Sequence, residues 1–187
     1  LDIRQIIPVK EAEEYTIKMA EKAQEEQSTQ DELKGRYQVR LEFWKQHLQK
    51  FNRKSNLFSN ISPSKDNWLS AGTGVSGVGF NFTISRTYAR TEVYMSRIVA
   101  EENKFIFDKL LAQKETIENE TGALEWERLD DKKACRIKQE LNNVNLYEKD
   151  DWEKMSNFMI DSMLKLEPAF RKPLNKINNE LKKEFKE

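Results

Sequence analysis

One pair of alternating segments constrains the fold of this chain more than any other feature. In residues 80–86 (FNFTISR), Phe80, Phe82 and Ile84 point one way, and the polar residues between them point the other. A second segment with strand character, 90–98, follows after a short turn. The two segments predict a β-hairpin with one face that packs and one face that is polar.

The rest of the chain predicts an α-ββ-α-ββ-α order. The remaining elements are a core helix over 31–51, a helix over 101–121 ended by Gly122, a second hairpin of strands 124–129 and 134–141, and a last helix that begins near Asp150 or Asp151. Pro168 and Pro173 are expected to kink or break that last helix. Beyond them, a second amphipathic stripe is expected to fold back onto its own domain; it consists of Leu174, Ile177, Leu181 and Phe185.

These elements predict an α+β fold, in which a four-stranded antiparallel sheet from two β-hairpins has helices packed on one face. Residues 52–79, around Trp68, are expected to form a long loop. Residues 1–30 are expected to be a connector strand and a linker helix, an N-terminal extension of a single domain over 31–187. Because the chain starts without Met, it is expected to be a fragment of a longer protein.

Composition narrows the class of protein. Of the 187 residues, 34% are charged, yet ten Phe, five Tyr and four Trp supply the apolar anchors that disordered chains lack. No run approaches the roughly 18 apolar residues of a membrane span, and no signal peptide is recognisable, so a cytoplasmic protein without a membrane partner is predicted. The single Cys135 and the single His47 exclude an internal disulfide and a multi-histidine metal site, and no cofactor is predicted.

Basic residues are concentrated in two stretches. Residues 43–100 hold eight basic and two acidic residues, a net charge of +6, and residues 132–138 hold four basic and no acidic residues. We expect both hairpin turns to project toward one edge of the sheet and to contact nucleic acid there. The candidate nucleic-acid-binding residues are Arg86, Arg90, Lys132, Lys133, Arg136 and Lys138. The alternative is that the charged blocks neutralise one another across the fold.

A polar cluster is also predicted on the sheet, formed by Glu92, Tyr94, Trp126 and Glu127. Tyr94 and Trp126 would stack on bases if they faced outward, although a buried Trp126 is favoured. Glu125 shares a strand face with Glu127, which favours solvated cross-strand partners for Arg136 or Lys138 over a metal site with Glu92.

No catalytic residues are predicted. Metal-dependent nucleases of the PD-(D/E)XK type need a strand-borne Asp and Glu-x-Lys, and here Glu-x-Lys occurs in segments expected to be helical, among them 32–34 and 180–182. The GxGxxG match of Gly72, Gly74 and Gly77 lies between a loop and a strand, which favours a structural turn over an anion-binding loop. His47 is expected to be a surface or half-buried residue, and Cys135 is expected to be a small core residue.

The segment 107–137 (FDKLLAQKETIENETGALEWERLDDKKACRI) carries a resemblance, together with Phe43-Trp44, the three glycines and the Glu92-Val-Tyr94 strand. Over residues 41–170 the chain resembles an uncharacterised prokaryotic domain-of-unknown-function family, found C-terminal to restriction-endonuclease-like (NucS-like) nuclease domains. The resemblance implies an upstream nuclease-like domain in the same polypeptide. It supplies no catalytic residues.

The expected function is therefore that of a non-catalytic C-terminal accessory module of a nuclease-associated prokaryotic protein, which binds DNA or positions the nuclease in DNA metabolism or defence. The alternative is a protein-interaction or dimerisation module that forms a homodimer and binds no nucleic acid. A third interpretation is a free-standing enzyme acting at Glu92, Glu127, Lys133 and Arg136.

Overall fold

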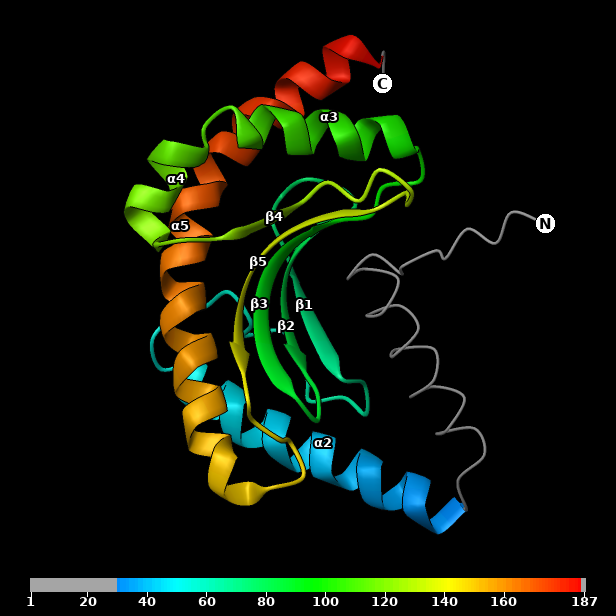
Figure 1. Cartoon of the computed structure of the whole chain (residues 1–187), viewed down its shortest axis with the longest axis vertical. Helices are drawn as coiled ribbons and strands as arrows, with labels where there is room; N and C mark the ends of the chain where they lie inside the picture. Colours follow the sequence, from blue (N-terminus) through cyan, green and yellow to red (C-terminus); the bar gives the residue numbers. More distant parts are fainter. Residues whose placement is uncertain (1–29, 186–187) are drawn as a thin grey trace, which may run out of the picture. The chain divides into compact units, whose positions relative to one another are not determined.

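The computed structural model describes residues 30–185 (Figure 1). The chain divides into two compact units, Leu1–Gln38 and Val39–Glu187. The described residues include only the last part of the first unit, residues 30–38, which begin a helix. The predicted extension of residues 1–30 lies outside the described residues, apart from Gln30. Within 30–185, every helix is too short or too polar to cross a membrane.

Four α-helices occur in the described part of the chain. They are α2 (Gln30–Phe51), α3 (Ala100–Leu111), α4 (Lys114–Thr121) and α5 (Trp152–Glu184), the last preceded by a 3-10 turn (Lys149–Asp151). The single helix predicted over 101–121 is wrong, because the backbone tightens where the Gln113 N–H donates to the Leu110 carbonyl and a new helix begins at Lys114. Gly122 ends α4, as predicted.

Five strands form one antiparallel sheet within these residues, in the order β1-β2-β3-β5-β4 (Figure 1). They are β1 (Trp68–Gly72), β2 (Val78–Ile84), β3 (Tyr88–Met95), β4 (Glu125–Glu127) and β5 (Cys135–Asn142). The predicted α+β class, antiparallel sheet and two hairpins are confirmed. The predicted strand number is wrong, because β1 forms from the segment expected to be a loop.

β1 escaped prediction because its alternation is too short to detect. Only two of its five residues, Leu69 and Ala71, are apolar and buried, and Ser and Gly beside them are typical of loops. The strand is instead defined by its partner: β1 pairs with β2 along its whole length, from Trp68 opposite Thr83 to Gly72 opposite Gly79. Tertiary pairing rather than local pattern makes this segment a strand.

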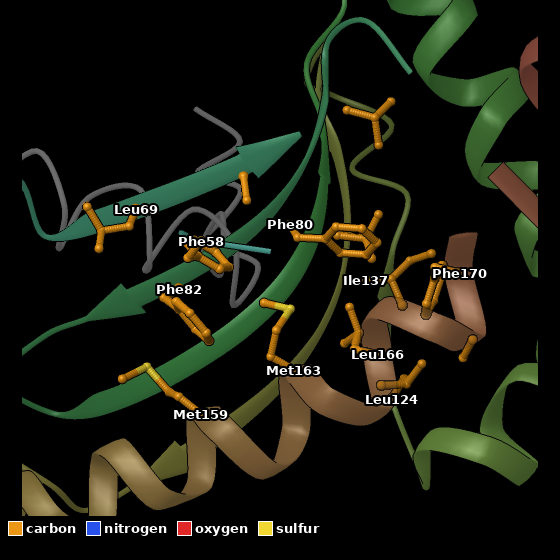
Figure 2. Close-up of a cluster of buried hydrophobic side chains, with 14 of the residues drawn as sticks. Phe58, Leu69, Phe80, Phe82, Leu124, Ile137, Met159, Met163, Leu166 and Phe170 are labelled. Atoms are coloured by element: carbon orange, nitrogen blue, oxygen red, sulfur yellow. The ribbon is translucent and has the colours of Figure 1, made fainter. Parts of the chain in front are cut away.

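One face of the sheet, here called the apolar face, packs against helices. Its buried apolar residues are Leu69, Ala71, Val78, Phe80, Phe82, Ile84, Ala89, Val93, Met95, Cys135 and Ile137. Figure 2 shows side chains of α5, among them Met159 and Met163, pointing toward Phe80 and Phe82. Each such fully buried large side chain contributes about 1.5–3 kcal/mol of transfer free energy, so this layer stabilises the fold.

α5 continues through both prolines, so the predicted break at Pro168 and Pro173 is wrong. Each proline removes one backbone hydrogen bond, but buried residues flank both of them on the inner side of the helix. The apolar stripe beyond them folds back as expected, since Leu174, Ile177 and Leu181 are at most 2% exposed. Packing on both sides of the prolines therefore outweighs the lost hydrogen bonds.

Candidate nucleic-acid interface

The face opposite the apolar face carries half of the residues predicted to bind nucleic acid. Strand register arranges its side chains in three cross-strand rows. The first row holds Trp68, Thr83, Arg90 and Glu140; the second holds Ser70, Asn81, Glu92, Lys138 and Glu125; the third holds Gly72, Gly79, Tyr94, Arg136 and Glu127. Because side chains alternate along a strand, all of these residues share one side of the sheet, here called the charged face.

Lys138 lies at the centre of an ion-pair network on the charged face. Its side chain is 2% exposed, and its Nζ lies 3.1 Å from Glu127 Oε1, 3.3 Å from Glu140 Oε2 and 3.4 Å from Glu125 Oε2. Arg136 forms a further ion pair with Glu127. The predicted cross-strand pairing of Glu125 and Glu127 with Lys138 and Arg136 is confirmed, but the expectation that the partners are solvated is wrong, because Arg136 and Lys138 are buried.

Arg90 is held on this face in a similar way. Its Nε and Nη2 atoms lie 2.7 and 2.6 Å from Glu140 Oε2, and its guanidinium carbon lies 4.4 Å from the centre of the Tyr88 ring. Burial lowers the pKa of Arg90, but neighbouring Tyr88, Glu92 and Glu140 outweigh burial and raise this pKa above its ordinary value. The guanidinium is therefore permanently charged and already engaged.

Three of the six predicted nucleic-acid-binding residues, Arg90, Arg136 and Lys138, are thus buried in ion pairs rather than displayed to solvent. A phosphate would have to displace a carboxylate and enter a desolvated network to reach them, which carries a large free-energy cost. In this part of the chain, a high content of basic residues in the sequence does not produce a basic surface that is open to solvent.

The other three residues do not meet at one edge of the sheet. Arg86 is exposed beside the start of β3, and its guanidinium lies 5.0 Å from the centre of the Tyr147 ring. Lys132, half-buried, and Lys133, exposed, precede β5. β3 and β5 are antiparallel, with Tyr88 opposite Asn142 and Met95 opposite Cys135. The two turns therefore lie at opposite ends of the sheet, about 23 Å apart along the strands, contrary to the expected single edge.

The predicted polar cluster divides between the two faces. Glu92, Tyr94 and Glu127 lie on the charged face, whereas Trp126 lies on the apolar face, half-buried, with its ring 6.2 Å from that of Phe107. The Trp126 indole N–H donates to Glu118 Oε1 at 2.9 Å. That hydrogen bond, together with one from the Leu124 N–H, lowers the pKa of Glu118. Within 30–185, no three acidic, His or Cys side chains form a group that could hold a metal ion.

The glycine-rich motif forms the turn between β1 and β2. Gly77 has a φ of +72°, and a Cβ at this position would lie 2.7 Å from Cγ of Arg97. The Arg97 side chain donates to the Ser76 carbonyl at 2.7 Å, and the Thr73 hydroxyl donates to the Val78 carbonyl at 2.9 Å. These contacts support the interpretation of the motif as a structural turn.

Side chains at the start of α3 form hydrogen bonds with the backbone of Arg97 and of neighbouring segments. The Asn103 side chain accepts from the Arg97 N–H and donates to the Arg97 and Lys133 carbonyls. The next side chain, Lys104, donates to the carbonyls of Arg128, Leu129 and Ala134. The β1–β2 turn, the end of β3 and the β4–β5 connection are thus joined by side-chain hydrogen bonds.

The expectation for His47 is wrong, because its side chain is 1% exposed. The ring contacts Phe82 at a centroid distance of 4.5 Å, and Nδ1 lies 2.9 Å from Ser156 Oγ. Burial, with a smaller effect from Lys50, lowers the His47 pKa to about 3, so the ring is neutral at physiological pH. The prediction for Cys135 is confirmed: it is buried, and burial raises the pKa of its thiol.

A second group of basic residues lies on the outer side of α2 and on the turn that follows it. These residues are Lys45, Lys50, Arg53 and Lys54, all exposed, and we call them the acid-free surface. Residues 43–65 contain no Asp or Glu. None of the four forms an ion pair within the described residues, in contrast to the basic residues on the charged face.

Helical spacing arranges this surface in two neighbouring rows. On α2, one row contains Lys45 and Gln49 and the other contains Gln46 and Lys50, because residues four apart lie on one side of a helix, and Arg53 and Lys54 follow in the turn after Phe51. Just beyond, the Ser55 hydroxyl donates to Glu167 Oε2 at 3.3 Å, but the charge of Glu167 is balanced by Arg171, 2.6 Å away. The net charge over 43–100 does not distinguish these residues from the paired cations of the charged face. The absence of acidic residues over 43–65 is the sequence signal that does.

Comparison with known proteins yields one match. A family model described as a domain of unknown function, DUF4268, matches residues 39–174. This range includes the sheet, the basic residues of the charged face and of the acid-free surface, and most of α5. No curated protein and no solved structure matches the chain.

Proposed function

We propose, for a chain that belongs to the DUF4268 family of unknown function, that it is a nucleic-acid-binding module whose acid-free surface contacts the phosphate backbone. One observation carries this proposal. Four exposed basic side chains, Lys45, Lys50, Arg53 and Lys54, lie together in a 23-residue stretch that lacks any acidic residue. Free cations of this kind release counterions when they meet phosphates, which favours binding.

The side chains between these cations fit the same partner. Exposed Gln46, Gln49, Asn56, Ser59 and Asn60 accompany them. Amide and hydroxyl groups, together with Lys and Arg, are the usual donors to phosphate and sugar oxygens. A surface of this composition favours binding that depends on salt and carries little sequence specificity.

We further propose that this binding serves a non-catalytic accessory role beside a nuclease-like domain of the same polypeptide, in prokaryotic DNA metabolism or defence. The support is the resemblance of segment 107–137, the paired state of Glu92 and Glu127 and the exposed cations. In this role the module holds DNA near the nuclease, in the cytoplasm. Inactivity of the purified module toward DNA in Mg²⁺ or Mn²⁺ is expected, and cleavage that is lost in Glu92→Ala or Glu127→Ala would contradict it.

A protein-interaction module is the second candidate, and it has its own supporting observation. Ile98 is 88% exposed and Val99 is 42% exposed in the connection between β3 and α3. Adjacent exposed aliphatic residues are typical of partner contacts, including contacts in a homodimer. The apolar stripe of α5 beyond the prolines does not support this interpretation, because Leu174, Ile177 and Leu181 are buried. A monomer–dimer equilibrium abolished by Ile98→Asp would favour it.

The deciding experiment measures binding of labelled duplex and single-stranded DNA across a salt series. The test variant replaces Lys45, Lys50, Arg53 and Lys54 by Gln. The control variant replaces four exposed lysines of α5 by Gln and so removes the same charge: Lys154, Lys165, Lys182 and Lys183. We expect the slope of log K against log salt to shrink by about 0.9 for each lost phosphate contact in the test variant only. Equal losses in both variants, or no wild-type binding at low salt, would overturn the proposal.

A further inference from the structure

The outer edge of β1 is open to pairing with another strand. β1 is the first strand in the order of the sheet, so only one of its two sides pairs with a strand in the described part of the chain (Figure 1). Edge strands of folded proteins usually carry a charged residue, a proline or a bulge, which blocks pairing with a second chain. β1 (WLSAG) contains no charged residue and no proline, and its register with β2 is unbroken. The edge therefore lacks the usual protection.

The hydrogen-bond pattern identifies the backbone groups on this edge. The Ile84 N–H of β2 donates to the Asn67 carbonyl at 2.8 Å. Because hydrogen-bonded pairs alternate along antiparallel strands, Leu69 and Ala71 also bond to β2, and the residues between them direct their N–H and C=O groups outward. The outward residues are Trp68, Ser70 and Gly72. Within residues 30–185, no hydrogen bond uses their outward backbone groups, which remain available to a further strand.

The side chains on this edge match one another in shape. Trp68 is 50% exposed, although tryptophan is a largely buried residue in most proteins. Gly72 lies four residues later on the same side of the sheet, and a Cβ there would meet nothing within 4 Å. The backbone does not require glycine at this position, because Gly72 has no positive φ. An aromatic side chain that lies over a glycine of the neighbouring strand would fill this space.

Both positions are satisfied by a strand that carries its large and small residues in the reverse order, and β1 itself provides that order. When two copies of β1 run antiparallel with Ser70 opposite Ser70, Trp68 of each copy lies opposite Gly72 of the other. Every outward residue then faces an outward residue, which is the condition for a regular antiparallel ladder. A two-fold axis at Ser70 relates the copies, as in most homodimers.

We infer that β1 is the interface of a homodimer, in which the sheets of two copies of this chain join edge to edge into one antiparallel sheet. Backbone hydrogen bonds hold the two β1 strands together, and each Trp68 indole covers Gly72 of the other copy. Leu69 and Ala71 are already buried in the single chain and add little area. The interface is small, so the dimer is weak and depends on protein concentration. This inference does not rest on the acid-free surface or on Ile98.

The test measures the mass of the full chain by sedimentation velocity at increasing protein concentration, together with amide hydrogen exchange. We expect the mass to rise toward twice that of one chain. Exchange of the Ser70 amide should slow about tenfold when about nine tenths of the chains are dimeric, because its N–H faces the second copy. The Leu69 amide, which faces β2, is the internal control and should not change. A monomer at every concentration, or a dimer without protection of Ser70, would overturn the inference.

A proline variant tests the backbone pairing. Ser70→Pro removes the central outward N–H and should abolish the dimer. The ladder with β2 does not use this N–H, and proline is tolerated on an edge strand where the N–H faces solvent. Ile98→Asp changes the exposed aliphatic residue before α3 and is the control, in which the dimer should persist. A dimer that is lost in Ile98→Asp and kept in Ser70→Pro would contradict an interface at β1.

A second pair of variants tests the register and serves if Ser70→Pro does not fold. Trp68→Lys should weaken dimerisation about tenfold, because two cross-strand contacts are lost. Trp68→Lys/Gly72→Glu should restore it, since each lysine then lies opposite a glutamate of the other copy. Within one chain these two positions are about 13 Å apart along the strand, too far for an ion pair. A double variant that dimerises no better than Trp68→Lys would overturn the proposed register.

Discussion

The charged face of the sheet and the acid-free surface on α2 are both rich in basic residues, but they present them in opposite ways. On the charged face, Lys138 has three carboxylates within 3.4 Å and Arg90 is 1% exposed. On the acid-free surface, Lys50 and Arg53 are exposed and form no ion pair within the described residues. A cation's availability therefore depends on its neighbours in space, and net charge along the chain does not report it.

The largest expected effect separates the two regions by stability. Lys138→Met should destabilise the fold by about 3–5 kcal/mol, because Glu125, Glu127 and Glu140 would be left without their shared cation. Lys50→Met, on the acid-free surface, should change stability by less than about 0.5 kcal/mol. Urea unfolding of the two variants measures both. Equal stability of the two proteins would show that the network is not a structural unit.

The next effect is the pH dependence of stability that results from the buried His47. This residue lies on α2, whose outer side carries the acid-free surface. The His47 pKa is about 3 in the folded protein, against an ordinary value of 6.5, so the unfolded chain binds a proton more readily. Stability is therefore full above pH 6.5 and falls as pH decreases toward 3. The expected loss is about 1.4 kcal/mol per pH unit, or about 2 kcal/mol at pH 5.

His47→Gln removes this titration, so its stability should depend less steeply on pH between 3 and 6.5 than that of the wild type. Comparing the two slopes cancels the contribution of the carboxylates, which both proteins share. Chemical denaturation at half-unit pH steps provides the slopes. Parallel curves would mean that His47 is not buried as described.

A smaller effect tests the acid-free surface residue by residue. Arg53→Gln should reduce the salt slope of DNA binding by about 0.9, the value for one phosphate contact, with little change in thermal unfolding. The matched substitution Arg128→Gln changes an arginine that is already paired with Asp108 and Asp130 and should leave the slope unchanged. A loss of similar size in both variants would indicate diffuse attraction rather than a defined contact.

The smallest effect is expected at the hairpin turns. Arg86→Gln/Lys133→Gln should change the salt slope by less than about 0.5, because the two residues lie at opposite ends of the sheet and do not form one contact surface. A reduction as large as that in Arg53→Gln would restore the turns as part of the interface.

Local pattern predicted part of this molecule and missed the rest for identifiable reasons. The alternation of Phe80, Phe82 and Ile84 was enough to predict β2, and the period of two placed Glu125 and Glu127 opposite Lys138 and Arg136. These features depend on residues near one another in the chain or across one hairpin.

What escaped prediction depends on contacts between distant segments. The pairing of β3 with β5 puts the two turns at opposite ends of the sheet, and no local signal specifies that register. The burial of His47 needs Ser156 and Phe82, which come from α5 and β2. For the proposed interface, the stretch with net charge +6 contains exposed as well as buried cations, and burial decides which of them reach solvent.

Asn103 and Lys104 of α3 help to join the β1–β2 turn, the end of β3 and the β4–β5 connection, and this affects how the structure opens locally. The Arg97 N–H, the Lys133 carbonyl and the Ala134 carbonyl all bind side chains from two consecutive residues of α3. When the first turns of α3 detach, these hydrogen bonds are lost together, so this end of the sheet behaves as one cooperative unit in amide exchange. The Arg97 amide should therefore exchange at the rate set by the opening of α3, and Asn103→Ala should accelerate it while leaving the centre of β2 protected.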